Sequence, residues 1–600
     1  MIKGITGKTL LGLVKALGDD ALNLIAKDPE VLRTIPGIGE KKAATIIKAL
    51  QGATAEDKAA SKLEGAGITP AIARGLTRKY GGSALHEFKS NPYLALKGIK
   101  GVGFKKADKL ALKSGVDALA KIRIEAAAEE VVSMEESRGS TLVDARTMDA
   151  GVYALTGQEG ATLTCGTHYQ RPILEEAEKK IAAFCNRSIT NSRIFRELEY
   201  GLVDEQKAAV IKALGFNTSI ITGPPGSGKT RTIQTIFNEF SGRVALTAPT
   251  GRAAQRMGQV CDSPAMTIHR LLKFNPGSED FQHNEINPLN YDMVIVDECS
   301  MLDTELAAAL LSAIRPNTHV VLVGDYDQLP SVGPGRVFAD IIESGIIPTT
   351  KLTKVFRQAE GSTIVELGRQ VIRGEDSNKL SWGEECGFRY ISRDSDKAAK
   401  ELVSIIAHEL VTQYGWTPDK TVVLTPKNDG PLGSVELNKE LQRIFNPLGL
   451  NGDDEVAAYG VRFRIGDRVC QKINNYKIHF DGAFNGDIGT VTKIDPFMKS
   501  VWVTMWNGKT INYRGGALFQ LALGYAVSIH KAQGSEYENV VLVAHGCHSH
   551  LLNSNLLYTG ITRAKKKLLV AGSLYAFDIA RGKTERRNTG LPLLLAPVNA

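Results

Sequence analysis

The sequence has 600 residues, which is far more than one hydrophobic core usually supports, and about four domains are expected. Hydrophobic residues make up 43% and charged residues 23% of the chain, which is typical of a globular protein and excludes a disordered or fibrous one. The formal charge of +8 favours a nucleic-acid partner only weakly, unless the basic residues gather along a groove.

The cysteines and the apolar runs indicate the cellular compartment in which the protein is expected. The seven cysteines are widely spaced and form no CxxC pair, which argues against zinc knuckles and disulfide frameworks. The N-terminus lacks a signal-peptide pattern, and no stretch approaches the roughly eighteen apolar residues of a membrane span. We therefore expect a cytoplasmic protein.

Near the N-terminus, glycine turns precede amphipathic helices. One turn holds Gly37 and Gly39, another holds Gly101 and Gly103, and a looser copy lies between them. These stretches look like helix-hairpin-helix motifs, in which the glycines let backbone N–H groups approach a phosphate. We expect these four glycines to contact DNA without reading its sequence. A scaffold for protein docking is the alternative.

The stretch "SIITGPPGSGKTRTIQTIF" predicts a strand, a glycine-rich loop and a helix, the setting that a phosphate-binding loop requires. Lys229 is expected to reach the β- and γ-phosphates of ATP, and the Thr230 hydroxyl to hold Mg²⁺. The residues assigned to this nucleotide site are Gly223, Pro224, Pro225, Gly226, Ser227, Gly228, Lys229, Thr230 and Arg231.

An apolar run, "YDMVIVDECSML", ends in Asp297 and Glu298, as expected of a buried parallel strand that opens onto a site. Asp297 is expected to complete the Mg²⁺ shell, and Glu298 to orient the attacking water. Two more runs, "RVALTAP" and "HVVLVGD", complete a pattern of four parallel strands with helices between them.

Five further stretches occur in this order along the chain: "TAPTGRAA", "GDYDQLPSVGPG", "KVFRQ", "GYAVSIHKAQGSEYENVVLV" and "LLYTGITRAKKKLLVAGS". This ordered set resembles superfamily 1 helicases, and within them the RecD-like branch, whose members move 5′ to 3′ on single-stranded DNA. The resemblance covers residues 200–575.

The resemblance implies a second RecA-like domain that closes on the nucleotide, with "KTVVLTP", "YENVVLV" and "KKLLVAG" as strands. Arg357 and Arg563 are then expected to reach the γ-phosphate, Gln328 to sense it and Gln206 to read the adenine. Residues 119–197 are implied to be a helical or winged-helix-like connector.

The resemblance also implies where the strand is held. The expected DNA contacts in the helicase core are Pro249, Thr250, Gly251, Arg252, His269, His530, Lys531 and Gln533.

Two insertions interrupt the helicase pattern. Residues 273–290 are polar and turn-rich, and by resemblance form a β-hairpin pin that splits the duplex; a disordered surface loop is the alternative. Residues 460–515 alternate like the strands of a small antiparallel barrel and resemble the SH3-like insertion of the family. Asn474, Asn475 and Tyr476 are expected to contact the strand there, although barrel core is an alternative role for its aromatic residues.

The fold predicted is α/β: two RecA-like parallel-sheet domains, an all-α helix-hairpin-helix N-terminal region and an SH3-like β-barrel insertion. The domains expected are residues 1–118, 119–197, 198–350 and 351–600. Any module that precedes the hairpin repeats in longer relatives is expected to be absent.

The predicted function is that of an ATP- and Mg²⁺-dependent DNA helicase moving 5′ to 3′, in DNA repair or recombination. It is expected to act as a monomer on single-stranded DNA and on duplex junctions. An RNA translocase and an ATP-driven binding switch without unwinding are the alternatives. A nuclease is disfavoured, because no carboxylate cluster with a lysine occurs outside the ATP site.

Overall fold

The computed structural model describes most of the chain from residue 55 onward and, before that, only isolated positions. From residue 55 the description leaves out residues 118–119, 157–167, 170, 188–200, 276, 279, 357–361, 449–454, 474, 476–477, 479–482, 484, 506–507, 582, 584–586 and 596–600. The chain divides into two units. The first comprises Met1–Ser137 with Leu142–Arg171, and the second Arg138–Thr141 with Pro172–Ala600.

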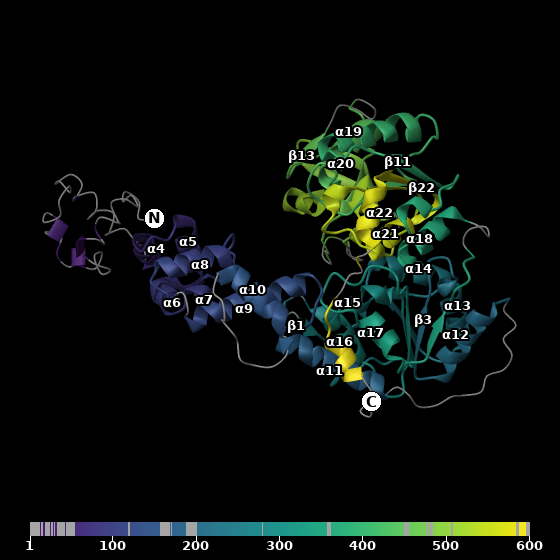
Figure 1. Cartoon of the computed structure of the whole chain (residues 1–600), viewed down its shortest axis with the longest axis horizontal. Helices are drawn as coiled ribbons and strands as arrows, with labels where there is room; N and C mark the ends of the chain where they lie inside the picture. Colours follow the sequence, from purple (N-terminus) through teal and green to yellow (C-terminus); the bar gives the residue numbers. More distant parts are fainter. Residues whose placement is uncertain are drawn as a thin grey trace. The chain divides into compact units, whose positions relative to one another are not determined.

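The described part of the first unit is mostly helical (Figure 1). Its helices are α4 (Ala55–Gly65), α5 (Pro70–Tyr80), α6 (Ala84–Ser90), α7 (Pro92–Leu96), α8 (Phe104–Lys113), α9 (Lys121–Ser137) and α10 (Ala145–Thr156). One antiparallel ribbon pairs β1 (Val143–Asp144) with β2 (His168–Tyr169). Apolar side chains such as Leu76, Phe88 and Ala127 form a single core, so the predicted all-α character of the hairpin region holds where it is described.

The second unit contains two lobes, and a six-stranded parallel sheet forms the first. The strand order is β10-β3-β9-β8-β4-β5. The strands are β3 (Thr218–Thr222), β4 (Val244–Ala248), β5 (Ala265–Thr267), β8 (Met293–Val296), β9 (His319–Gly324) and β10 (Thr349–Lys351). The four predicted strands are confirmed, and two three-residue strands extend the sheet at its edges.

Helices cover both faces of this sheet because neighbouring strand residues point to opposite sides. Ile220 packs in a core with α11, α16 and α17, whereas Ile221 packs in another with α12 and α13. The helices are α11 (Pro172–Arg187), α12 (Asp204–Gly215), α13 (Lys229–Glu239), α14 (Gly251–Cys261), α15 (Ile268–Leu271), α16 (Thr304–Ser312) and α17 (Val337–Ser344). α11 falls inside the predicted connector, yet Ala177 and Ile181 place it in the first lobe's core. The domain boundaries drawn from the sequence stay predictions.

The second lobe is a five-stranded parallel sheet with the order β11-β22-β21-β12-β20. Its strands are β11 (Cys386–Tyr390), β12 (Thr421–Thr425), β20 (Ala526–Ser528), β21 (Tyr537–Ala544) and β22 (Ala564–Gly572). Its helices include α18 (Thr363–Arg373), α19 (Ser395–Ser404), α20 (Ser434–Phe445), α21 (Ser554–Ile561) and α22 (Leu574–Arg581). The three strands predicted for this lobe are confirmed as β12, β21 and β22.

Both predicted insertions contain paired strands. In the first lobe β6 (Phe274–Asn275) and β7 (Asp280–Phe281) form a short antiparallel hairpin. In the second lobe an antiparallel sheet has the order β18-β17-β16-β15-β19. Its strands are β15 (Arg468–Gln471), β16 (Ile488–Asp495), β17 (Ser500–Met505), β18 (Thr510–Arg514) and β19 (Leu521–Leu523), beside a ribbon of β13 (Val456–Ala458) and β14 (Val461–Phe463).

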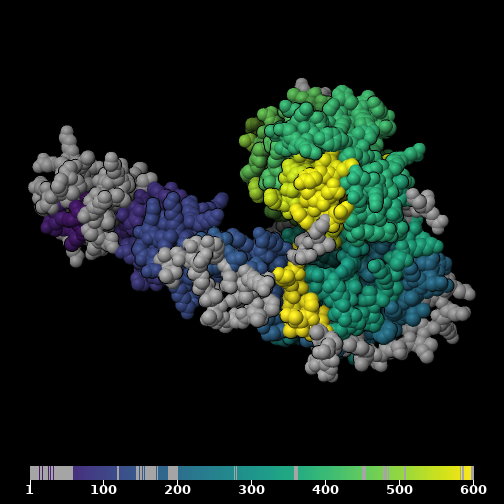
Figure 2. Space-filling model, in the orientation of Figure 1, coloured from purple at the N-terminus to yellow at the C-terminus, as the bar shows by residue number. Residues whose placement is uncertain are grey.

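The C-terminal segment returns to the first lobe. Ala576 and Phe577 of α22 lie in the core of the second lobe, whereas Leu591 and Leu595 of α23 (Leu591–Leu595) lie in the core of the first. Figure 2 shows a yellow patch of this segment against the teal surface of the first lobe. The chain therefore connects the two lobes a second time.

Candidate nucleotide and nucleic-acid site

The glycine-rich loop lies between β3 and α13, as predicted. Gly226 and Gly228 have φ of 82° and 84°, the left-handed region that glycine adopts without a steric penalty. A Cβ at Gly228 would stand 2.1 Å from Gln206 Nε2, so a side chain at this position would collide with Gln206. The Lys229 ammonium donates to the carbonyls of Gly223 and Pro224, at 2.5 and 3.0 Å. It thereby stays at the centre of the loop.

Gln206 and Ser227 line the same loop from inside. Gln206 is buried and donates from Nε2 to the Ser227 carbonyl at 3.3 Å. Ser227 Oγ is buried without a hydrogen-bond partner in the part of the chain that the structure describes. An orphaned hydroxyl beside a lysine at a helix N-terminus fits a phosphate group, so these residues suit a nucleotide.

The remaining loop residues flank this centre. Pro224, Pro225 and Thr230 are partly buried, whereas Arg231 is exposed. Across the described ranges, no group of three or more His, Cys, Asp or Glu side chains is placed to hold a metal ion. A site for Mg²⁺ would therefore need oxygens from the phosphates and water besides Thr230 and Asp297.

The acidic pair follows β8 directly. Asp297 Oδ1 accepts the Glu298 backbone N–H at 2.8 Å, and Glu298 has φ of 55°, which is uncommon for a residue with a side chain. Burial raises the pKa of Asp297 although Lys229 opposes the shift. Burial and the neighbouring Asp297 raise the pKa of Glu298 to about 7, against the positive charges of Arg563 and Lys229. Backbone strain and displaced pKa values cluster at functional sites.

Gln328 and Arg563 lie where the two lobes meet. Gln328 is 4% exposed, donates from Nε2 to Asp325 at 3.1 Å and leaves Oε1 without a partner among the described residues. Arg563 is 2% exposed and donates to the backbone carbonyls of Thr559 and Ser535, at 3.0 and 3.1 Å. Arg357 lies outside the described residues. Leu329, next to Gln328, donates to Thr559 Oγ1 of the second lobe at 2.9 Å, and Arg563 is near enough to Glu298 of the first lobe to oppose the rise of its pKa. Both residues therefore lie near the contact between the lobes.

A cleft of about 520 Å³ brings together predicted strand contacts that are far apart in the sequence. Its lining includes Thr250 and Arg252 from the first lobe, and His530, Lys531 and Gln533 from the second. Arg252 also donates to Ser535 Oγ at 2.9 Å, across the two lobes. A groove with Arg252 on one wall, and with lysine and amide side chains on the other, suits a single-stranded polyanion.

Other residues of the cleft were missed by sequence reasoning. These are Met301, Val332, Pro426, Lys427, Asn428, Asp429, Asn485, Gly486, Ser528, Ser535 and Leu551. The group at 426–429 follows β12, so the rule that sites gather at the carboxyl ends of parallel strands would have found it. Val332 lies in the stretch "GDYDQLPSVGPG" after β9, so the same rule would have found it, whereas no comparable signal marks Leu551.

Some predicted strand contacts lie elsewhere. Gly251 lines a neighbouring cavity of about 520 Å³, and Pro249 lies just before Thr250 without lining the cleft. His269 packs against Phe274 and Phe281 at the base of the hairpin, with ring centroids 5.6 and 5.8 Å apart. Their roles at the strand stay predictions.

In the insertion, the side chain of Asn475 donates to Gln520 Oε1 at 2.9 Å. Asn474 and Tyr476 lie outside the described residues.

The glycine turn of the first unit is open. Gly101 has φ of 78°, and a Cβ at Gly101 or Gly103 would meet no atom within 4 Å. Lys105 and Lys106, in the first turn of α8, are exposed. Gly37 and Gly39 lie outside the described residues. A backbone turn that leaves this space open among the described residues, beside two lysines, is suited to a phosphate.

Family models account for most of the chain. They are described as a SAM-like helix-hairpin-helix tandem (residues 1–51), an ATP-dependent RecD2 DNA helicase HHH domain (52–142), an AAA domain (201–389), an ATP-dependent RecD-like DNA helicase SH3 domain (437–505) and a UvrD-like helicase C-terminal domain (523–571).

Curated relatives extend this likeness. The ATP-dependent RecD2 DNA helicase of Deinococcus radiodurans is 32% identical over 98% of this chain and 85% of its own length. The RecBCD enzyme subunit RecD of Mycolicibacterium smegmatis is 30% identical over 66% of this chain and 75% of its own. Among solved structures, Bacteroides Pif1 bound to single-stranded DNA is 18% identical, with a TM-score of 0.41 over 64% of this chain and 94% of that one. Within the described residues, no helix has the length and apolarity to cross a membrane.

Proposed function

The chain belongs to the RecD-like family of ATP-dependent DNA helicases, and from that premise we propose that it moves 5′ to 3′ along single-stranded DNA and opens duplexes ahead of it. The observation that carries the proposal is the cleft whose walls come from both lobes. The contacts between the cleft and a bound strand would change whenever the lobes close or open. The direction rests on the family alone.

In the nucleotide site, Lys229 binds the β- and γ-phosphates and Gln206 contacts the adenine. Thr230 and Asp297 hold Mg²⁺, which supplies charge neutralisation on the phosphates when bound. Glu298 orients the attacking water, and its raised pKa reflects a carboxylate that burial disfavours. Gln328 senses the γ-phosphate, while Arg357 and Arg563 stabilise the charge that develops on it.

At the strand, Thr250, Arg252, His530, Lys531 and Gln533 hold the backbone. Gly101 and Gly103 add contacts to phosphates in the first unit. The protein acts as a monomer on single strands and junctions, in DNA repair or recombination.

The test separates binding from hydrolysis at the nucleotide site. Lys229→Ala should lose ATP affinity and turnover together, because the loop loses its only ammonium group. Glu298→Gln should still bind ATP, but hydrolyse it about 10² to 10⁴ times more slowly, the usual contribution of a positioned acid or base. Nucleotide binding and DNA-stimulated hydrolysis are measured for each variant.

Glu239→Gln, at the far end of α13, serves as the control and should match the wild type. Hydrolysis by Glu298→Gln at a near wild-type rate would withdraw the role assigned to Glu298.

A further inference from the structure

The segment 587–595, here named the C-terminal strap, leads from the second lobe to the first. Leu591 and Leu595 are each 1% exposed and share a core with residues of α11, α16 and α17. Asn588 pairs with the segment before β1 through its carbonyl, which accepts the Thr141 N–H at 2.8 Å. The strap is therefore packed into the first lobe.

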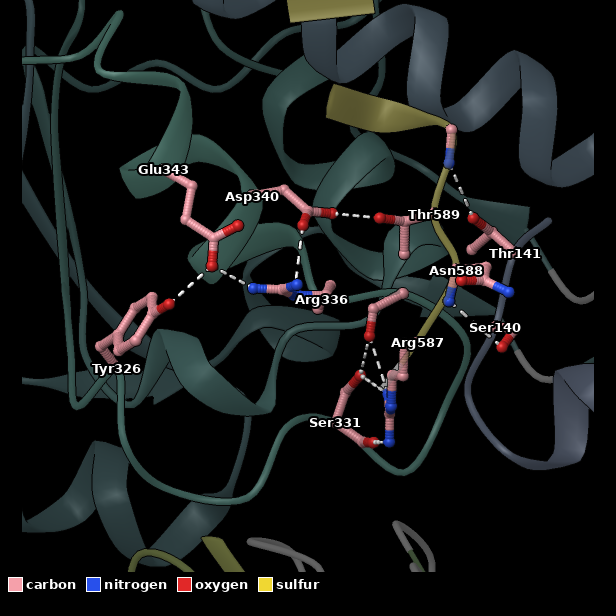
Figure 3. Close-up of polar contacts among 12 residues, drawn as sticks. Ser140, Thr141, Tyr326, Ser331, Arg336, Asp340, Glu343, Arg587, Asn588 and Thr589 are labelled. Atoms are coloured by element: carbon pink, nitrogen blue, oxygen red, sulfur yellow. Dashed lines mark hydrogen bonds and ion pairs between the residues drawn. The ribbon is translucent and has the colours of Figure 1, made fainter. Parts of the chain in front are cut away.

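Arg587, at the start of the strap, is buried and grips one loop of the first lobe. Its guanidinium donates to the carbonyls of Ser331, Gly333 and Gly335 at 2.7, 3.0 and 2.7 Å. Figure 3 shows the side chain pointing from the strap at Ser331. A Cβ at Gly139 would lie 2.1 Å from Arg587 Cζ, so the guanidinium occupies the space that a side chain at position 139 would need. Three carbonyls on one planar group fix the path of that loop.

The loop that Arg587 grips, residues 325–335, is here named the coupling loop. In the first half of the loop, the Leu329 N–H donates to Thr559 Oγ1 at 2.9 Å, and the Leu329 carbonyl accepts a hydrogen bond from Gln533 at 3.0 Å. Near its end, Val332 is 75% exposed and lines the strand cleft. The loop therefore runs from the nucleotide sensor Gln328 to the wall of the cleft.

We propose that Arg587 is a positioning residue that holds the coupling loop in shape, so that a change at Gln328 is transmitted to Val332 in the cleft. The inference rests on the function proposed above. Arg587 does not line the strand cleft, and it acts through the loop. Without the hydrogen bonds from Arg587, the segment 331–335 loses its fixed path while Gln328 keeps its own hydrogen bond to Asp325.

The strap has a second anchor that provides the control. Thr589 Oγ1 donates to Asp340 at 2.8 Å, and Arg336 lies 3.3 Å from the same carboxyl group (Figure 3). Thr589→Val removes one hydrogen bond of the strap and leaves every hydrogen bond between Arg587 and the coupling loop. Loosening of the strap and release of the coupling loop can thus be told apart.

The experiment compares Arg587→Met with Thr589→Val in the full chain. For Arg587→Met, the ATPase rate at saturating single-stranded DNA and the number of base pairs opened per ATP should each fall about tenfold, since small misplacements of a site are costly. Its KM for ATP and its ATPase without DNA should stay within about twofold of the wild type. Thr589→Val should change none of these beyond about twofold.

Two outcomes would overturn the inference. One is an Arg587→Met protein that opens as many base pairs per ATP as the wild type. The other is an equal loss in both variants that follows their melting temperatures, which would assign Arg587 to stability alone.

If Arg587→Met does not fold, Arg587→Lys keeps the charge without the planar fork and should open fewer base pairs per ATP than the wild type. A Lys variant with unchanged coupling would then refute the proposal. A wild-type protein that opens no duplex would contradict the proposed function instead, so the two failures are distinct.

Discussion

The two lysines at the start of α8, Lys105 and Lys106, stand beside the backbone turn of Gly101 and Gly103. Gly101 and Gly103 leave the turn open, and Lys106 Nζ donates to the Gly101 carbonyl at 3.3 Å. Charges placed beside open N–H groups bind phosphates without regard to base sequence. At this scale, a few exposed side chains determine how strongly DNA affinity depends on salt.

Replacing Lys105 and Lys106 by alanine should weaken DNA binding equally for unrelated sequences. The slope of log K against log salt should fall by about one for each phosphate that is no longer neutralised. Binding is measured by titration at several salt concentrations. Lys113→Ala with Lys121→Ala removes the same charge from the far end of α8 and the start of α9, and should leave the slope near the wild-type value. Equal slopes for all three proteins would support protein docking as the role of the hairpins.

Residues that are neighbours in the sequence could be predicted as site residues, because one local pattern fixes them together. The loop from Gly223 to Thr230 is of this kind, and the structure places it between the strand and helix expected. Arg587 is different, since its partner Gly335 lies 252 residues away. Gly335 ends the stretch "GDYDQLPSVGPG", but no local pattern marks Arg587. The left-handed backbone of Glu298 also leaves no trace in a sequence read by residue type.

Among the elements, the hairpin of β6 and β7 is small, and aromatic side chains pack where its two strands begin and end. Phe274 and Phe281 pair across it and surround His269, with the two phenyl centroids 5.1 Å apart. Burial lowers the pKa of His269, so the imidazole beside the two phenylalanines favours its neutral form. The tip can therefore be altered while the base stays intact.

Exchange of residues 275–280 for a Gly-Ser turn should abolish strand separation, if the hairpin is the pin. DNA-stimulated ATPase and movement on single strands should stay within about twofold, because the cleft is untouched. Strand displacement, ATPase and single-strand translocation are measured in parallel. A similar shortening of the turn between β16 and β17, at 496–499, is the control and should leave all three intact. Loss of all three activities in the hairpin variant would indicate a role in folding.

Long apolar runs made most strands predictable, and their length explains what was missed. β3, β4, β8 and β9 have four to six residues, nearly all buried, whereas β5 and β10 have three. Three residues are too few for a periodic pattern to stand out. The same limit applies at the end of the insertion, where β19 reaches Leu523 beyond the predicted boundary at 515.

In the second unit as a whole, contacts between the lobes join the nucleotide site to the strand cleft. Tyr558 donates to Asp325 at 3.0 Å, and Arg256 lies 2.8 Å from Glu536. The C-terminal strap leads the chain from the second lobe back to the first and so links the two lobes a second time. If the lobes close on a nucleotide, these contacts would change the nucleotide site and the cleft together, which is the requirement for a motor.

The polarity of movement follows from family membership and from no single side chain, so direction is the claim that most needs measurement. The test is strand displacement with ATP and Mg²⁺ on two duplexes that differ only in carrying a 5′ or a 3′ single-stranded tail. We predict that the duplex with the 5′ tail is opened and that the one with the 3′ tail is not. Efficient opening from the 3′ tail alone would contradict the assignment, and the roles proposed for the hairpin and the cleft would fall with it.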